Sequence, residues 1–184
     1  MPDERGVTHY DLMPIPPIET HTQFFEAGSV VIGVEYRLLD DAIAAASNLT
    51  RADGAETGTS EKIDDRGVSI HVYAVENDEQ WEQLRFDCFE EDPHYHYVSW
   101  KEQTNQMIHM DCTAVGDPVD WALNCIRTRL PQMLRHTGAH EAADQFDPLA
   151  LQAILPRVAE AAYRARFDYD EEAIRQKALG RAVS

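Results

Sequence analysis

VSIHVYAVENDEQWEQLRFDCFEEDPHYHYVSW, residues 68–100, is the stretch that decides the fold. Apolar and polar side chains alternate in three runs, at residues 68–76, 81–89 and 94–100. The short polar turns ENDEQ and EEDP join the runs. Alternation with a period of two is typical of strands, and short turns join antiparallel neighbours. The stretch therefore predicts an antiparallel meander.

Two more strands are expected, one on each side of this meander. Residues 29–38 (SVVIGVEYRL) are rich in β-branched side chains, and residues 106–112 (QMIHMDC) follow the polar turn KEQTN. Further along the chain, Asp117 and Asp147 each precede a proline at the first position of an expected helix. Strands followed by helices are typical of the α+β class. We expect a mostly antiparallel sheet of about five strands, with the C-terminal helices packed on one face and the other face open.

The N-terminal segment has a different composition. Residues 1–22 contain four prolines, which are poorly tolerated inside helices and central strands. We interpret this segment as an extended arm that lies on the body of the protein through Ile15 and Ile18. Residues 23–184 are then expected to form a single α+β domain, since their number is within the usual size of one domain.

Composition and charge disfavour several classes of partner. The chain has 33 acidic and 16 basic residues and a formal charge of −17, so it repels phosphate backbones and nucleic acid is disfavoured. No window approaches the ~18 uninterrupted apolar residues of a membrane span, and the N-terminus lacks the pattern of a signal peptide. We expect a cytoplasmic protein with no membrane partner. Exposed strand edges favour a homodimer.

Alternation sorts the strand side chains into two sets. The apolar set, expected to pack against the helices, comprises Val68, Ile70, Val72, Ala74, Leu84, Phe86, Cys88, Val98, Trp100, Ile108, Met110 and Cys112. The polar set, expected on the open face, comprises His71, Tyr73, Arg85, Asp87, Tyr95, Tyr97, His109 and Asp111. This concentration of ionisable groups predicts a polar ligand site, in which His71, Tyr95 and Tyr97 would contact the ligand.

His94 and His96 form the clearest candidate for metal binding. Two imidazoles at positions i and i+2 lie on one face of a strand, about 7 Å apart along the backbone. This spacing suits a divalent metal such as zinc, with a further ligand from one of the nearby aspartates Asp87, Asp92 and Asp111. The alternative is a pair of histidines that are only hydrogen-bonded at the end of a sheet.

The direction in which these histidines point is open at the level of sequence. If Val98 and Trp100 face the helices, alternation turns His94 and His96 to the same side. A bulge after Pro93 would reverse that direction, since bulges occur where a turn enters a strand.

Arg85, Asp87, His109 and Asp111 are the candidate catalytic residues. On antiparallel neighbours, His109 would act as an acid or base oriented by an aspartate, and Arg85 would hold an anionic group. The alternative is ordinary cross-strand ion pairing on a solvated face.

The segment RFDCFEEDPHYHY, residues 85–97, together with the order of strands and helices, resembles small bacterial families classified as domains of unknown function. It is also similar to an R-x-D pattern with a histidine-rich turn in toxin-like proteins of toxin–antitoxin pairs. The resemblance implies that Arg85, Asp87, His94 and His96 are the positions to carry over. The acidic charge argues against RNA cleavage, because such toxins need a basic surface.

Two classes of function follow from these patterns. The first is a small binding or assembly module with a polar ligand site on the open sheet face. The second is a small metal-assisted hydrolase or toxin-like nuclease that uses the histidine and aspartate residues. The sequence contains neither a phosphate-binding loop nor a serine-hydrolase motif.

Overall fold

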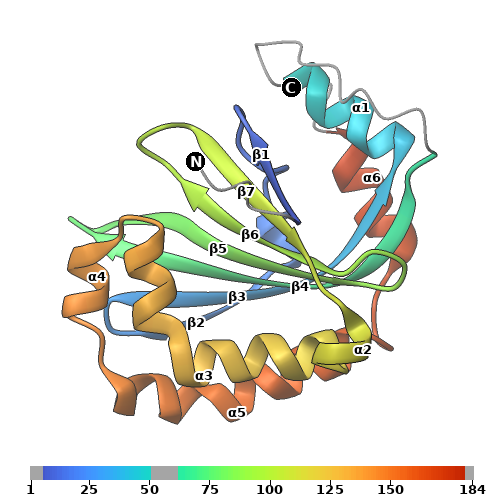
Figure 1. Cartoon of the computed structure of the whole chain (residues 1–184). Coiled ribbons are helices and arrows are strands. Elements are labelled where there is room, and N and C mark those ends of the chain that lie inside the picture. Colours follow the sequence, from blue (N-terminus) through green and yellow to red (C-terminus); the bar gives the residue numbers. More distant parts are fainter. Residues whose placement is uncertain (1–5, 51–61, 181–184) are drawn as a thin grey trace.

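The computed structural model describes residues 6–50 and 62–180, which form an antiparallel sheet with helices beside it (Figure 1). The strands are β1 (Val7–Tyr10), β2 (Gln23–Ala27), β3 (Val30–Asp40), β4 (Asp64–Glu76), β5 (Glu79–Phe89), β6 (His94–Ser99) and β7 (Thr104–His109). The helices are α1 (Asp41–Thr50), α2 (Cys112–Val115), α3 (Pro118–His136), α4 (His140–Asp144), α5 (Pro148–Ala165) and α6 (Glu171–Leu179), with the 3-10 turn η1 (Glu19–His21).

Seven strands form the sheet, in the order β1-β7-β6-β5-β4-β3-β2, and all neighbours are antiparallel. The α+β class and the antiparallel sheet are therefore confirmed, but the expected number of about five strands was too low. The five expected runs are β3 to β7. β1 and β2 were not predicted, because these edge strands have only four and five residues, too few for a clear alternating pattern.

The C-terminal helices pack on one face of the sheet, as expected (Figure 1). α3 contacts β4 and β5, and α5 contacts β2, β3 and β4. Both helices begin where the sequence indicated, because Asp117 and Asp147 each accept two backbone N–H hydrogen bonds at the helix start. The core between helices and sheet includes Ile32, Ile70 and Ile126, which are completely buried.

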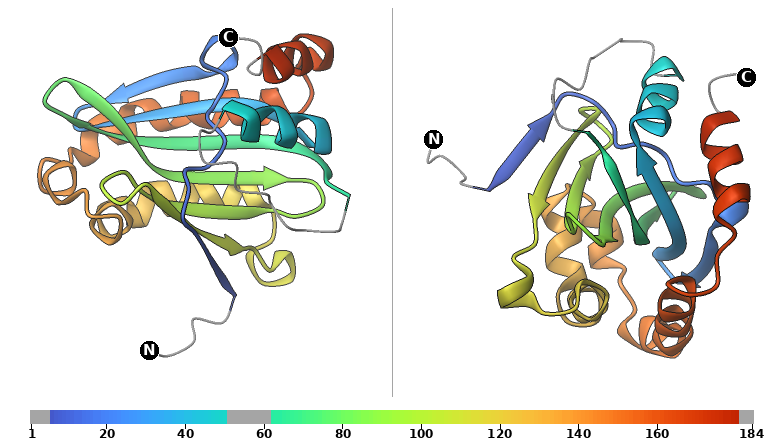
Figure 2. Two further views of the ribbon diagram at one scale, coloured as in Figure 1. Left: turned by 90° about the horizontal axis from the view of Figure 1, so that it is seen from above. Right: turned by 90° about the vertical axis from the view of Figure 1, so that its right-hand side faces the viewer.

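The opposite face of the sheet is covered by residues 11–22, which we call the arm. β1 pairs with β7 at one edge and β2 pairs with β3 at the other, so the chain between β1 and β2 has to cross all the strands that lie between them. Figure 2 shows this crossing from above. The expectation of an open face is therefore wrong. β1 lies within residues 1–22 but belongs to the sheet. The division into an arm of residues 1–22 and one domain of residues 23–184 stays a prediction.

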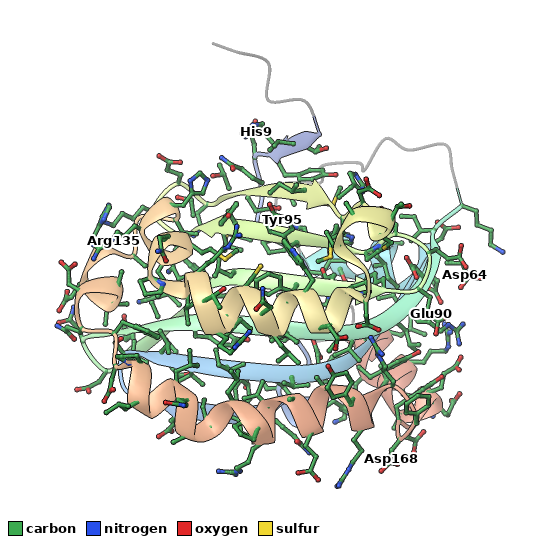
Figure 3. All side chains as sticks on the ribbon, turned by 60° about the horizontal axis from the view of Figure 1, so that its bottom comes forward. His9, Asp64, Glu90, Tyr95, Arg135 and Asp168 are labelled. Atoms are coloured by element: carbon green, nitrogen blue, oxygen red, sulfur yellow. The ribbon has the colours of Figure 1, made fainter. Side chains whose placement is uncertain are left out.

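The outer surface carries the acidic charge of the chain. Asp64, Glu90 and Asp168 are exposed and lie at the periphery of the molecule in Figure 3. In the described ranges, no helix combines the length and the hydropathy needed to cross a bilayer. The expected cytoplasmic location and the expected homodimer stay predictions.

Candidate metal centre on the covered face

The cross-strand register decides which side chains lie under the arm. Asp87 is opposite His94 and Arg85 is opposite His96, so these four side chains share one face. That face is the one opposite the helices, because the alternate residue Phe86 belongs to the helix-side core. His94 and His96 do share a face with Val98, as alternation predicted, but the whole set points toward the arm. No bulge after Pro93 is needed to explain it.

Tyr95 and Tyr97 point the other way, so their expected place on the polar face is wrong. Their rings pack at the helix side, where Tyr95 lies 5.3 Å from Trp121 and Tyr97 lies 4.3 Å from His136, measured between ring centroids. Both tyrosines are half buried, and tyrosine rings suit packing of this kind because they contribute a large apolar surface. Packing against α3 therefore places both tyrosines on the helix side of the sheet.

Asp87, His94 and His96 converge on one point between β5 and β6. The Nε2 atoms of His94 and His96 each lie 3.4 Å from Oδ2 of Asp87. All three side chains are buried, and one ligand atom from each lies within 4.8 Å of the other two. These are the two histidines that the sequence indicated as metal ligands and one of the three aspartates proposed beside them.

Hydrogen bonds behind the imidazoles orient both rings. His94 places Nδ1 at 2.7 Å from the backbone carbonyl of Asp92, and His96 places Nδ1 at 2.9 Å from Oδ1 of Asn105. The Asn105 amide group donates to the carbonyl of Leu12 at 2.7 Å, so its oxygen is directed toward His96. Nδ1 can therefore donate to these oxygen atoms, so the Nε2 atom of a neutral ring has a lone pair that can bind a metal ion, whereas the Nε2 atom of a protonated ring donates to Asp87.

The electrostatics of the three groups agree with this arrangement. Burial alone would raise the pKa of Asp87, but the neighbouring imidazoles and Arg85 hold it well below the usual range. Ser69 donates its hydroxyl hydrogen to the other carboxylate oxygen of Asp87. Burial lowers the pKa of His96, whereas Asp87 outweighs burial at His94 and raises its pKa. The cluster therefore contains an anionic carboxylate and one imidazole that is readily neutral.

A second buried network lies beside this cluster and is centred on His71. Its Nδ1 is 2.6 Å from Oε1 of Glu82, and its Nε2 is 3.0 Å from Oε1 of Glu35. Arg85 binds Glu82 through two hydrogen bonds of 2.9 and 2.8 Å, and Arg37 lies 3.4 Å from Glu35. Burial opposes the charged form of His71, but the two carboxylates outweigh it and raise its pKa. His71 is thus held by protein groups on both sides.

A β-bulge places Glu82 in this network. Val72 pairs with Leu84 but Tyr73 pairs with Glu82, so Gln83 is an extra residue in β5. Beyond the bulge the two faces of β5 are exchanged, and Glu82 takes the place on the polar face that simple alternation would assign to Gln83. Alternation could not have identified Glu82 for this reason.

His109 is paired with His94 across β6 and β7, with ring centroids 6.2 Å apart, whereas Asp111 follows β7. The His109 side chain is half exposed and its Nδ1 lies 2.7 Å from Oδ1 of the exposed Asp92. Asp111 caps α2 by accepting a hydrogen bond of 3.0 Å from the backbone N–H of Thr113. The expected catalytic set is therefore not brought together as a unit, and a catalytic role for its members stays a prediction.

The arm is held by side chains of the sheet. The carbonyl oxygen of Ile15 accepts hydrogen bonds from Arg85 Nη1 at 2.6 Å and from Arg37 Nη2 at 3.1 Å. The backbone N–H of Ile18 donates to Glu35 at 3.1 Å. Five further residues of the buried networks were not predicted from the sequence: Glu35, Arg37, Ser69, Glu82 and Asn105. A signal existed for Glu35 and Arg37, which are charged residues inside the otherwise apolar run SVVIGVEYRL.

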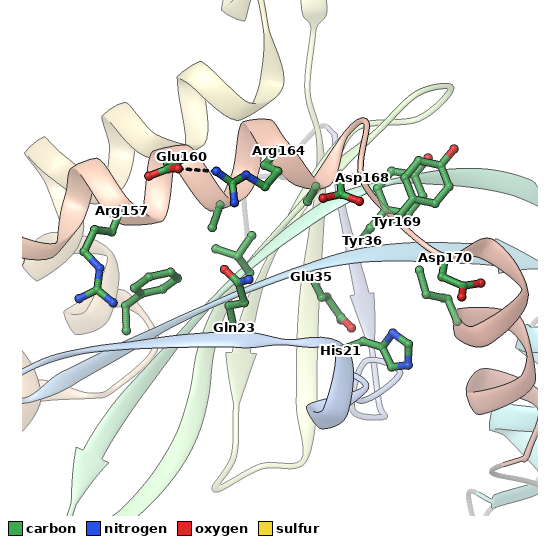
Figure 4. A pocket seen from close by; sticks show the side chains of 15 residues that line it. His21, Gln23, Glu35, Tyr36, Arg157, Glu160, Arg164, Asp168, Tyr169 and Asp170 are labelled. Atoms are coloured by element: carbon green, nitrogen blue, oxygen red, sulfur yellow. Dashed lines mark hydrogen bonds and ion pairs between the residues drawn. The ribbon is translucent and has the colours of Figure 1, made fainter.

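A pocket of about 470 Å³ lies elsewhere, between α5, the start of α6, β2 and the middle of β3 (Figure 4). Its floor contains Phe25, Val34 and Tyr36, and arginine and acidic side chains of α5 form part of its rim. Glu35 contributes to the lining, but the residues of the metal cluster do not. The candidate metal centre is therefore covered by the arm and is not part of this pocket.

Comparison with known proteins identifies one family. Residues 24–162 match the family whose description is "Domain of unknown function (DUF7700)". The matched segment is more than half of the chain and includes β3 to β7 and α3, whereas the arm precedes it. No curated protein and no solved structure gives a significant match.

Proposed function

The chain belongs to the DUF7700 family of domains of unknown function, and we propose that it is a module that binds a divalent metal ion such as zinc. The proposed ligands are Asp87, His94 and His96. Membership of an uncharacterised domain family agrees with the resemblance inferred from RFDCFEEDPHYHY. The observation that carries the proposal is the convergence of two Nε2 atoms and one carboxylate oxygen on the same point.

The distances support a metal ion more than a set of hydrogen bonds. Ligand atoms at ~2.0–2.1 Å from a tetrahedral ion lie roughly 3.3 Å from each other. The two distances from Nε2 to Asp87 Oδ2 are 3.4 Å, which is longer than a normal charge-assisted hydrogen bond. A proton on one ring would satisfy only one of these contacts, whereas a cation would satisfy all three groups.

The groups behind the ligands also support the proposal. Metal-bound histidines usually donate their second N–H to a carbonyl or carboxylate oxygen, which orients the ring. His94 and His96 both meet this condition, through Asp92 and Asn105 respectively. When both rings are neutral, their Nε2 lone pairs face one carboxylate, and a cation stabilises this arrangement.

Metal-assisted hydrolysis is the second candidate. Three protein ligands leave the fourth position of a tetrahedral site for water, which is the arrangement of catalytic zinc sites. Hydrolysis of a test ester that requires zinc and is lost in His96→Ala would support this candidate over a purely binding role. A toxin-like nuclease has less support, since the acidic surface repels a nucleic acid substrate.

The proposal is tested by metal content. Protein purified without a histidine tag, treated with chelator and then supplied with ZnCl₂ is expected to bind one zinc ion per chain, measured by elemental analysis. Zinc should raise the melting temperature, because an ion that binds only the folded state stabilises it. His96→Ala is expected to lose the bound zinc while retaining its circular dichroism spectrum. Asn105→Ala should weaken zinc binding about 10–100-fold, because it removes an orienting group behind a ligand.

His140→Ala is the matched control, since His140 is exposed on α4 and lies outside the cluster. It should bind zinc as tightly as the unaltered chain. Zinc binding that is equal in His96→Ala and His140→Ala would contradict the proposed site. Sub-stoichiometric zinc with an unchanged melting temperature would contradict metal binding altogether.

A further inference from the structure

The contact between the arm and the sheet is unusual in its chemistry. Two guanidinium groups, from Arg37 and Arg85, converge on the single neutral carbonyl oxygen of Ile15. Both arginines are buried. Paired arginines typically bind carboxylate or phosphate groups, whose negative charge and several oxygen atoms match the guanidinium donors. The Ile15 carbonyl offers one oxygen and no net charge.

The donors at this point are not all satisfied by the arm. Arg37 Nη1 is buried and has no hydrogen-bond partner among the described residues, and its charge is paired with Glu35 at 3.4 Å. A buried N–H group without a hydrogen bond costs free energy, so a ligand that supplies an acceptor oxygen there is favoured. A carboxylate has the planar geometry of the amide carbonyl and adds a second oxygen that Arg37 Nη1 could reach.

The charge of the covered face points to the same ligand. Glu35 and Glu82 lie against Arg37, Arg85 and His71, and Asp87 lies against His94 and His96. A divalent metal at the cluster would add two positive charges to this buried set. Buried charge is costly unless it is compensated, so a loaded site favours an anionic ligand nearby. Arg85 is two residues before Asp87 on the same strand face, which puts the arginine pair beside the metal position.

The arm itself is placed as a substitute for such a ligand. It precedes the matched family segment of residues 24–162, while the side chains of Glu35, Arg37, Arg85 and Asn105, which bind it, belong to that segment. Asn105 binds both Leu12 of the arm and His96 of the cluster, so the arm and the metal position share one contact residue.

We propose that the arm occupies, within its own chain, a site for a carboxylate-bearing ligand, and that the ligand's carboxylate binds between Arg37 and Arg85 when the arm is displaced. The proposal deepens the proposed function, because it rests on that function for the charge of the loaded site. The arm then competes with the ligand. The apparent affinity for the ligand therefore equals the intrinsic affinity multiplied by the fraction of molecules in which the arm is displaced.

Succinate is the probe, and its binding to the full zinc-loaded chain is measured by calorimetry. Ile15→Gly retains the backbone carbonyl but removes the half-buried side chain that helps to hold the arm. We expect this variant to bind succinate about tenfold more tightly than the unaltered chain, because its arm is more often displaced. Succinate should also speed amide hydrogen exchange in residues 11–22 of the unaltered chain. Thr20→Gly, at an exposed position of the arm, is the matched control and should bind as the unaltered chain does.

Arg37→Gln should abolish succinate binding in the Ile15→Gly background, and Arg37→Lys, which retains the charge but not the fork, should weaken it. Melting curves establish that both variants are folded. Binding that persists in Arg37→Gln, or succinate that slows exchange in the arm, would overturn the inference. Tighter binding of inorganic phosphate than of succinate would overturn the assignment to a carboxylate.

Zinc content measured on the same samples separates this inference from the proposed function. Stoichiometric zinc without succinate binding in Ile15→Gly would overturn the ligand site alone. Succinate binding that depends on Arg37 in a chain that binds no zinc would support the ligand site and contradict the metal module.

Discussion

The two faces of the sheet are equally well buried but are held together by different physics. Arg85 and Phe86 are neighbours in β5, with exposed fractions of 2% and 0%. Phe86 points to the helices and packs among apolar and aromatic side chains such as Tyr95 and Trp121. Arg85 points to the arm and has a hydrogen-bond partner for each of its three nitrogen atoms.

The two faces are therefore suited to different functions. Apolar burial is non-directional, so the helix face is stabilised by close packing and tolerates exchange of one apolar side chain for another of similar volume. Buried ionisable groups need partners at defined positions, so the arm face depends on each member of its network. A face of the second kind can bind a metal or a ligand, because its groups already have fixed directions.

The largest expected effects are those of Arg85→Ala and Phe86→Ala, which separate the two kinds of face. Each should lower the free energy of unfolding by about 3–5 kcal/mol, because Arg85→Ala leaves the buried Glu82 without its arginine partner and Phe86→Ala leaves a cavity. Urea denaturation monitored by circular dichroism measures both.

The two variants should respond differently to a second substitution. Glu82→Met should recover much of the stability lost in Arg85→Ala, because it removes the buried carboxylate that has lost its arginine partner. The same Glu82→Met substitution should add its own cost to Phe86→Ala, since the two side chains lie on opposite faces and share no partner. If the changes in unfolding free energy add in both pairs, the arm face does not depend on its paired groups in the way proposed.

The next effect in size is a dependence of stability on pH that belongs to the arm face. The pKa of His71 is raised in the folded chain, because the carboxylates of Glu35 and Glu82 outweigh the burial that opposes its charge. The stabilisation should therefore be complete below the unfolded pKa of about 6.5 and be lost as the pH rises through the folded pKa. Each unit of raised pKa is worth ~1.4 kcal/mol.

Urea titrations between pH 5 and 9, with chelator present, measure this loss. His71→Gln should be less stable at pH 6 and should lack the part of the decline above pH 6.5 that His71 contributes. His94 also has a raised pKa and gives a decline of the same sign, so the difference between the two proteins isolates His71. Curves of equal slope would show that His71 is not charged in the folded protein.

The smallest expected effect is that of His109→Ala, at the border of the arm face. His109 forms an ion pair with Asp92 in which both side chains are about half exposed. Exposed pairs contribute only about 0.2–1 kcal/mol, so the variant should lose no more than that in urea denaturation. Zinc binding should be unchanged. A loss of zinc binding in His109→Ala would instead show that this exposed residue belongs to the metal-binding part of the arm face.

Much of the fold could be predicted because it depends on local patterns. Alternation located β4 to β6, β-branched composition located β3, and the polar turn KEQTN located the start of β7. The aspartate–proline pairs at 117–118 and 147–148 located the starts of α3 and α5. The short strands β1 and β2 carry no such pattern and were missed, since only their partners β7 and β3 make them strands.

The candidate site could be predicted only in part. His94 and His96 share a face because of their spacing, and Asp87 was among the proposed third ligands. Glu82 was hidden by a bulge, and Asn105 and Ser69 have no local feature that connects them to the histidines. Their roles arise from pairing between strands, which single-strand patterns do not contain.

The sequence by itself determined the class of the fold, the antiparallel meander and the fact that His94 and His96 lie on the same side of one strand. These features follow from side-chain periodicity and helix capping within short segments. Only the tertiary structure decided which side that is, because alternation relates residues to each other but does not say which face the helices will cover. The same packing decided that the polar face is buried, since the arm reaches across it only when β1 and β2 have joined opposite edges of the sheet.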